Sequence, residues 1–498
     1  MSIYEYICDH LTPSGVLPAD FKLPGSAAAI GSTQPALDDV RLVDGAQDGI
    51  ALFHGTSEDT DCSELVPLLS STSMGDLDSI QAAIEDYFAP SSGHRMLALE
   101  APLLQWVNDH TAEIPADGLF ALAAQLLVTT ENRECVKLAL VLFSMLEIED
   151  NAAVQEAVRT LALSDEFTLF ALHVIENGPN AEEEMLQLGK QVHGWGRIHV
   201  VEHLEARSGR VKDWLFHEGV HNTIGAAYSA RTVADKIHLD KVLTNPAFNA
   251  DDFVLTSAIL DGLLDESSMQ GLTAMQNRTA LLDGYLHQAR RCPQTEKTLN
   301  TLLSVRDYLG SNIFQGSGKL HERVEEILHT DDIRSFIQDL LAKKQGFRLA
   351  CRMGIPCTDA MLAAMEDAFN ANADLVDVLP KDPDTLKKIL DIYRRHLPLT
   401  MMASGPRDEL GLGESYRPYH QLSYLVQNLA DSAGEGEDLL IRSLNCPVNA
   451  NRQMALNVLK TWMQDGYEPD EAMQSALQQL METEPCEDIR TQLEALNS

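Results

Sequence analysis

The sequence predicts a mainly α fold: an α-solenoid, that is, a superhelix of antiparallel helix pairs, with a small β-hairpin near the N-terminus. From about residue 62 of 498 onward, nearly every segment carries apolar residues at three- and four-residue spacing. Gly, Pro, Asn or Asp interrupts this pattern about every 10 to 16 residues, as expected of short antiparallel helices. Several segments also begin alike, which indicates stacked repeats.

The N-terminal region, residues 1–60, differs from the remainder of the chain. VRLVDGAQDGIALFHG (40–55) places two apolar runs around Asp44-Gly45 and Asp48-Gly49, and this pattern predicts a β-hairpin. The helical repeats are expected over 61–400, and a Gly/Pro-rich loop at 401–417 interrupts them. Further helical repeats are expected over 418–498.

Five segments have similar beginnings, spaced about 26 to 33 residues apart, which is enough for two short helices and their turns. They are NRECVKLALVLFSML at 132, DEFTLFALHVIEN at 165, WGRIHVVEHLEA at 195, GAAYSARTVADKI at 225 and DDFVLTSAILDGLLD at 251. NRQMALNVLKTWMQ at 451 repeats the first of them closely. Such self-similarity implies units that cannot bury their own apolar faces without their neighbours.

These helices resemble the repeats of HEAT and armadillo proteins over about 100–430, with a further array at the C-terminus. MSIYEYICDHLTPSGVLP, DGAQDGIALFH and HGWGRIHVVEHLE also resemble a set of bacterial proteins, some of which carry a limonene hydroxylase label. That label implies a monooxygenase. The chain, however, lacks a Gly-x-Gly-x-x-Gly string between a strand and a helix, and none of its cysteines lies in a haem-binding type of loop.

The charge balance restricts the partners. The chain has 37 Lys+Arg and 75 Asp+Glu, a formal net charge of -38, which repels nucleic acid and anionic membranes. The same charge predicts a basic protein or peptide partner, with association weakened by salt. No N-terminal signal pattern is present, and the longest apolar run, 118–128, is too short to cross a bilayer. We therefore expect a cytoplasmic protein without a cofactor.

Two histidine-rich stretches have the spelling of zinc hydrolase motifs. They are His199-Val-Val-Glu202-His203 and His217-Glu218-Gly-Val-His221. One interpretation is that these are polar residues on exposed helix surfaces, with His199 and His203 facing outward. The other is a zinc site in which His199, His203 and His217 converge across a short turn at Ser208-Gly209, with Glu202 or Glu218 nearby and one coordination position open.

The stretch MMASGPRDELGLGESYRPYHQLSY (401–424) is a candidate binding loop because a long Gly/Pro segment is followed by Tyr416, Tyr419, His420 and Tyr424. The alternative is a domain boundary whose aromatic side chains pack on adjoining helices.

Together these observations favour a non-catalytic protein-binding or scaffolding solenoid that uses a groove of stacked helices. No catalytic residue is assigned. The alternative is an enzyme, either a metal-dependent hydrolase at His199, His203 and His217 or, through the resemblance alone, a monooxygenase.

Overall fold

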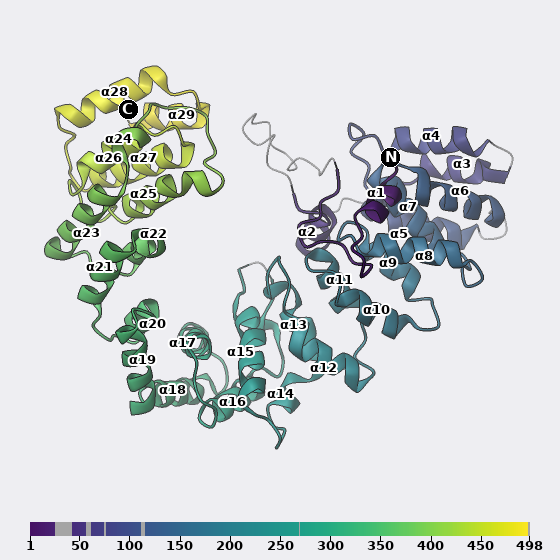
Figure 1. The fold of residues 1–498 in the computed structure, drawn as a ribbon, viewed down its shortest axis with the longest axis horizontal. Helices are drawn as coiled ribbons and strands as arrows, with labels where there is room; N and C mark the ends of the chain where they lie inside the picture. Colours follow the sequence, from purple (N-terminus) through teal and green to yellow (C-terminus); the bar gives the residue numbers. More distant parts are fainter. Residues whose placement is uncertain (25–41, 56–60, 74–75, 111–114, 268, 497–498) are drawn as a thin grey trace. The chain divides into compact units, whose positions relative to one another are not determined.

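The computed structural model describes residues 1–496 except for 25–41, 56–60, 74–75, 111–114 and 268, and these described residues are mainly helical (Figure 1). The helices up to residue 237 are α1 (Ile3–Asp9), α2 (Ala46–His54), α3 (Leu65–Ser70), α4 (Leu77–Tyr87), α5 (Met96–Asp109), α6 (Ala116–Thr129), α7 (Arg133–Ser144), α8 (Ala152–Ala162), α9 (Thr168–Ile175), α10 (Ala181–Gly189), α11 (Trp195–His203), α12 (Gly209–Glu218) and α13 (Ala227–Ile237).

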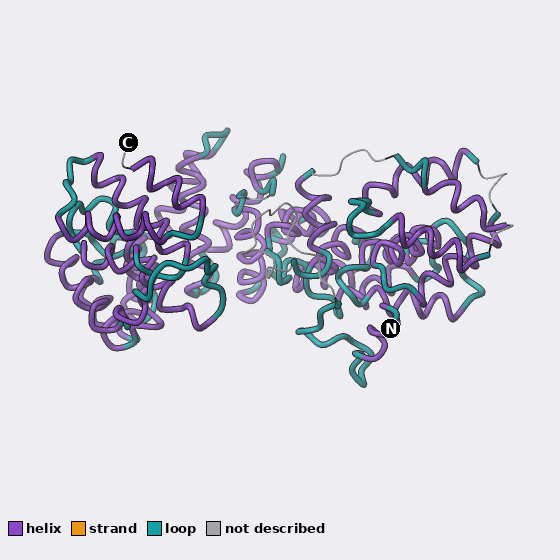
Figure 2. The backbone as a smooth tube through the Cα atoms, turned by 90° about the horizontal axis from the view of Figure 1, so that it is seen from above, coloured by secondary structure: helices purple, strands orange, loops and turns teal. Residues whose placement is uncertain are grey.

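The later helices are α14 (Leu239–Val242), α15 (Ala250–Leu264), α16 (Arg278–Ala289), α17 (Glu296–Ser311), α18 (Ser317–Leu328), α19 (Asp331–Ala342), α20 (Phe347–Arg352), α21 (Thr358–Asp367), α22 (Phe369–Asn372), α23 (Pro383–His396), α24 (Leu399–Met402), α25 (Arg417–Gln427), α26 (Glu437–Leu444), α27 (Asn449–Gln464), α28 (Glu471–Thr483) and α29 (Glu487–Leu496). Short 3-10 turns are η2 (Ser71–Ser73), η3 (Leu272–Ala274), η4 (Ala373–Asp377) and η5 (Glu414–Tyr416). None of the described residues forms a β-strand, and the one isolated bridge among them joins Glu409 to Val448. Figure 2 shows the same helices joined by loops.

The described residues fall into two compact units, one ending at Ile327 and the other beginning at Leu328. The predicted loop at 401–417 therefore lies inside the second unit. None of the helices in the described part of the chain is both long and apolar enough to span a membrane.

One row of helices runs through the first unit. In this row α7 packs on α9, and each of α9, α11, α13 and α15 packs on the next odd-numbered helix, ending at α17 (Figure 1). Helices α8, α10 and α12 pack against this row. The five segments with similar beginnings form α7, α9, α11, α13 and α15, so their self-similarity marks successive members of one row. This pairwise packing of neighbouring helices is compatible with a helical solenoid.

Burial explains why these helices need one another. Helix α7 is buried along ten consecutive residues, Glu134–Phe143. In α9 every residue except His173 is buried. A helix that is apolar on nearly all sides is stable in water only when neighbours cover it completely. The core of the first unit therefore follows this row.

The predicted β-hairpin at 40–55 is wrong, because Ala46–His54 forms helix α2. Residues 40 and 41 of that segment lie outside the described residues. Gly45 has φ 76° and begins the helix as its N-cap, so the Asp44-Gly45 pair marks a helix start and not a hairpin turn. At Gly49 a Cβ atom would lie 2.2 Å from the ring of Trp195, so glycine permits close helix packing there.

A fully buried ion pair stabilises the second unit. Arg452 on α27 donates to both carboxylate oxygens of Glu484, at 2.6 and 2.7 Å, and both side chains are 0% exposed. Arg452 also donates to the carbonyls of Cys446 and Pro447.

This pair has a counterpart in the first unit. Arg133, which follows Asn132 as Arg452 follows Asn451, contacts Glu166. Each acidic partner lies about one repeat further along, at separations of 33 and 32 residues. The similarity of the two sequence segments thus extends to one ion pair.

Replacing Glu484 with Ala should lower the free energy of unfolding of the second unit by about 3 to 5 kcal/mol, because Arg452 is left buried without its counter-charge. Urea denaturation followed by circular dichroism measures this change. The matched control is Glu482→Ala, which alters an exposed side chain in the last turn of α28, two residues before Glu484, and should cost less than about 0.5 kcal/mol. Equal stabilities of the two variants would show that the buried pair contributes little.

Candidate functional site

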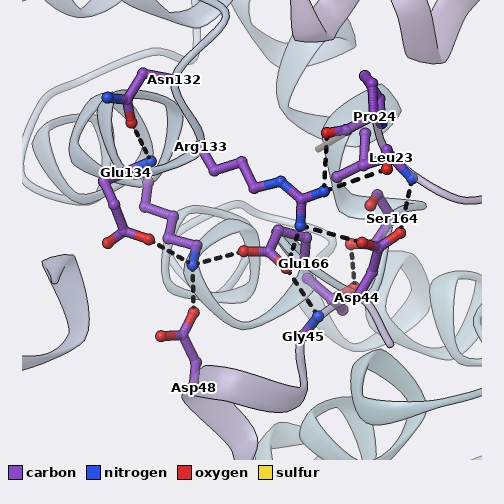
Figure 3. A network of polar contacts seen from close by, with 12 residues as sticks. Leu23, Pro24, Asp44, Gly45, Asp48, Asn132, Arg133, Glu134, Ser164 and Glu166 are labelled. Carbon is purple, nitrogen blue, oxygen red and sulfur yellow. Dashed lines mark hydrogen bonds and ion pairs between the residues drawn. The ribbon is translucent and has the colours of Figure 1, made fainter. Parts of the chain in front are cut away.

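A buried cluster of ionic side chains lies where α2 meets α7 and the turn before α9 (Figure 3). At its centre is Lys137, whose side chain is 1% exposed. The Lys137 ammonium lies 2.6 Å from Asp48, 2.8 Å from Glu166 and 3.0 Å from Glu134. Through this one ammonium, Asp48 of the N-terminal segment is linked to Glu134 and Glu166 of the helical array.

Arg133 extends this cluster toward the start of α2. Its guanidinium lies 3.1 Å from both Asp44 and Glu166, and it donates to the carbonyls of Leu23 and Pro24. The backbone N–H of Gly45 donates to Glu166 at 2.9 Å. Four carboxylates thus share two cations within the cluster.

The protonation of the cluster follows from burial and charge. Burial raises the pKa of Asp48 to about 6, although Lys137 opposes this shift. Burial alone lowers the pKa of Lys137, but the surrounding carboxylates outweigh it and hold that pKa well above its usual value. Lys137 is therefore an ammonium, which cannot act as a nucleophile or form a Schiff base. Its role in this geometry is to hold α2 on the array.

The stretch HGWGRIHVVEHLE begins beside another acid, the half-buried Asp165. The N–H of Gly196 donates to Asp165 Oδ1 at 3.1 Å. A Cβ atom at Gly194 would lie 2.2 Å from Asp165 Oδ2, so the backbone approaches this carboxylate as only glycine allows. Burial raises the pKa of Asp165 to about 7, although backbone hydrogen bonds from Gly196 and Gly194 oppose this shift.

The expectation that His199 faces outward is wrong. His199 is 1% exposed, and its ring centroid lies 6.3 Å from that of Phe53 on α2 and 6.4 Å from that of Trp195. Burial lowers the pKa of His199 to about 3, so the imidazole is neutral. The side chain belongs to the apolar contact between α2 and α11, where Ala46, Trp195 and Ile198 form a core cluster.

The other two predicted metal ligands have different partners. His203 forms a close hydrogen bond with Glu176, and its ring lies 5.3 Å from that of His173. The His217 ring lies 2.8 Å from the carbonyl of Asp213 within α12.

The two nearby glutamates are also engaged. Glu202 accepts from Thr232, and Glu218 pairs with Arg197. Across the part of the chain that is described, no three His, Cys, Asp or Glu side chains are grouped so that they could hold a metal ion. Zinc binding by His199, His203 and His217 stays an untested hypothesis.

The candidate binding loop is attached to the helix that follows it. Tyr416 donates to Glu409 at 3.1 Å, and the His420 ring lies 2.7 Å from the carbonyl of Gly411. Tyr419 contacts the ring of Tyr416, whereas Tyr424 is 42% exposed. Three of the four side chains thus make contacts within the loop and helix α25, and binding by this loop stays a prediction.

Several cavities lie among the described residues of the first unit, and sequence reasoning identified none of them. One, of about 700 Å³, lies beside Arg133, Glu134 and Glu166, whose charged groups are already engaged in the ion cluster. Another, of about 500 Å³, lies between the α7–α8 and α9–α10 connections and has an apolar floor. The only sequence signal for it is the run MLEIED (145–150), where apolar and acidic residues alternate outside a helix.

No family model matches the chain, and no curated protein or solved structure matches it.

The pKa of Asp165 gives the first unit a defined dependence on pH. Because the folded pKa of about 7 lies above the unfolded value of 3.8, the folded state keeps a proton that the unfolded chain has lost between these values. This group therefore lowers stability as pH rises from 4 to 7, by about 1.4 kcal/mol per pH unit. Asp165→Asn cannot ionise and should lose this contribution.

Urea denaturation of wild type and Asp165→Asn at several pH values between 5 and 8 measures the difference. The control Asp9→Asn, at an exposed position, should keep the wild-type slope. Parallel curves for wild type and Asp165→Asn would contradict the assignment.

Zinc titration by calorimetry tests the histidine prediction. We expect micromolar zinc to produce no heat that depends on His199 and His203, because the first ring is buried and the second is paired with Glu176. Heat that disappears in His199→Ala/His203→Ala would instead establish a metal site. An absorption spectrum of the same preparation would reveal a haem or a flavin.

Proposed function

We propose that this chain is a non-catalytic binding or scaffolding protein, built as a HEAT- or armadillo-like α-solenoid, that uses its stacked helices to bind a basic protein or peptide in the cytoplasm. The observation that carries the proposal is the formal net charge of -38 on a chain whose first unit is organised as a row of stacked helices.

The row α7–α17 supports this function because stacked helices offer an extended surface to a partner. Each unit can add a contact, so affinity can arise without a deep catalytic pocket. The buried charges also favour a non-catalytic function. Lys137 and Arg133 form ion pairs that hold α2, and neither is free to react with a substrate.

Charge sets the kind of partner. A surplus of carboxylates attracts Lys- and Arg-rich surfaces from a distance and raises the rate of encounter, while it repels nucleic acid. Salt screens this attraction, since the Debye length falls about threefold between about 50 and 500 mM NaCl.

The test is capture of proteins by the immobilised full-length chain in about 50 and about 500 mM NaCl, with identification by mass spectrometry. We expect basic proteins to dominate and their yield to fall several-fold at high salt. A polyglutamate resin of matched charge is the control for simple ion exchange. Equal yields at both salt concentrations, or the same set of proteins on the polyglutamate resin, would contradict the proposal.

A further inference from the structure

The cavity of about 500 Å³ opens between two connections that occupy equivalent places in neighbouring repeats. One connection, 145–151, joins α7 to α8, and the other, 176–180, joins α9 to α10. Side chains of α8 and α10 complete the walls. The cavity therefore arises from the stacking of the two repeats, and neither repeat would form it alone.

Hydrogen bonds hold the walls in place. Gln155 donates to the carbonyls of Ile148 and Glu149, at 3.1 and 2.7 Å, which orders the first connection. Asn177 of the second connection donates to the carbonyl of Ser144 at 2.8 Å and so ties the two together. A ligand would meet a preformed site and would not have to order these loops, which reduces the cost of binding.

A two-pronged ion pair adds to this order. The Arg159 guanidinium on α8 donates to both carboxylate oxygens of Glu184 on α10, each at 3.0 Å. This pair bridges the two helices at one side of the cavity.

The bottom of the cavity is apolar. Phe143, Val158, Val174 and Ile175 line it and are all buried. Met145, Leu146 and Ile148 also line it but are only half-buried, so apolar surface in the cavity remains open to water. An apolar side chain that entered would remove this surface from water, which is favourable.

The rim of the cavity is acidic. Glu147 and Glu149 line it and are exposed. The one basic side chain among the lining residues, Arg159, is already paired with Glu184. The rim therefore carries two carboxylates that no lining cation neutralises.

We propose that this cavity is the docking site for a peptide segment of the partner in which apolar side chains are flanked by Lys or Arg. The inference rests on the proposed binding function and names one place where it occurs. The apolar residues of the segment fill the cavity between the two connections, and its basic residues pair with Glu147 and Glu149. The charge of the rim selects a cationic segment, and the apolar floor selects one with an anchor side chain.

The test uses the fluorescein-labelled peptide KRGLFGRK and the full-length chain, with affinity measured by fluorescence anisotropy. We expect KRGLFGRK to bind, EEGLFGEE not to bind, and KRGSSGRK to bind at least about tenfold more weakly because it lacks the apolar anchor. Glu147→Lys/Glu149→Lys should weaken binding of KRGLFGRK at least about fivefold, since it reverses the charge of the rim.

The matched control is Glu322→Lys/Glu482→Lys, which changes the net charge equally at two exposed positions that do not line the cavity. Its affinity for KRGLFGRK should stay within about twofold of wild type. Circular dichroism of both double variants verifies that they fold.

Three results would overturn the inference: failure of KRGLFGRK to bind, equal binding of KRGLFGRK and KRGSSGRK, or an equal loss of affinity in both double variants. These results leave the proposed function standing if salt-sensitive capture of basic proteins persists. Loss of that capture as well would contradict both.

Discussion

Helix α7 has no exposed face along Glu134–Phe143, and most features of the first unit depend on this burial. Neighbouring helices must surround it, which places α6 on one side and α9 on another. The same burial brings Glu134 and Lys137 out of water, where an unpaired charge costs several kcal/mol. Their charges are therefore compensated by other buried side chains, and the segments that carry those side chains must pack against α7.

The compensating carboxylates come from distant parts of the chain. Asp48 belongs to α2 and Glu166 to the turn before α9, so one ammonium joins three segments. The cluster also places α2 so that Phe53 and Gly49 contact α11. Apolar packing by itself would tolerate several positions of so short a helix, whereas buried ion pairs specify one. We infer that this cluster fixes the position of α2 on the helical array, a role that buried polar groups also have in other folds.

Internal and external carboxylates have different roles in this molecule. Those near Lys137 and Arg452 are buried and consumed in ion pairs. Those at the rim of the 500 Å³ cavity, Glu147 and Glu149, are exposed, and the one cation among the lining residues, Arg159, is paired with Glu184. Connections between stacked helices can vary without loss of the core, so binding chemistry can develop there at little cost to stability.

The sequence by itself determined the helical class, because apolar spacing of three and four residues persists along the chain, and it determined which segments form successive members of one row. The tertiary structure alone decided that Ala46–His54 is a helix. The pairs Asp44-Gly45 and Asp48-Gly49 suit a turn locally, but in the fold Asp48 pairs with Lys137 and Gly49 packs on the ring of Trp195. The tertiary structure likewise decided that His199 is buried, because α2 covers it. The cavity was not predictable for the same reason: it is formed by two repeats, and periodicity describes each helix but not the space between neighbours.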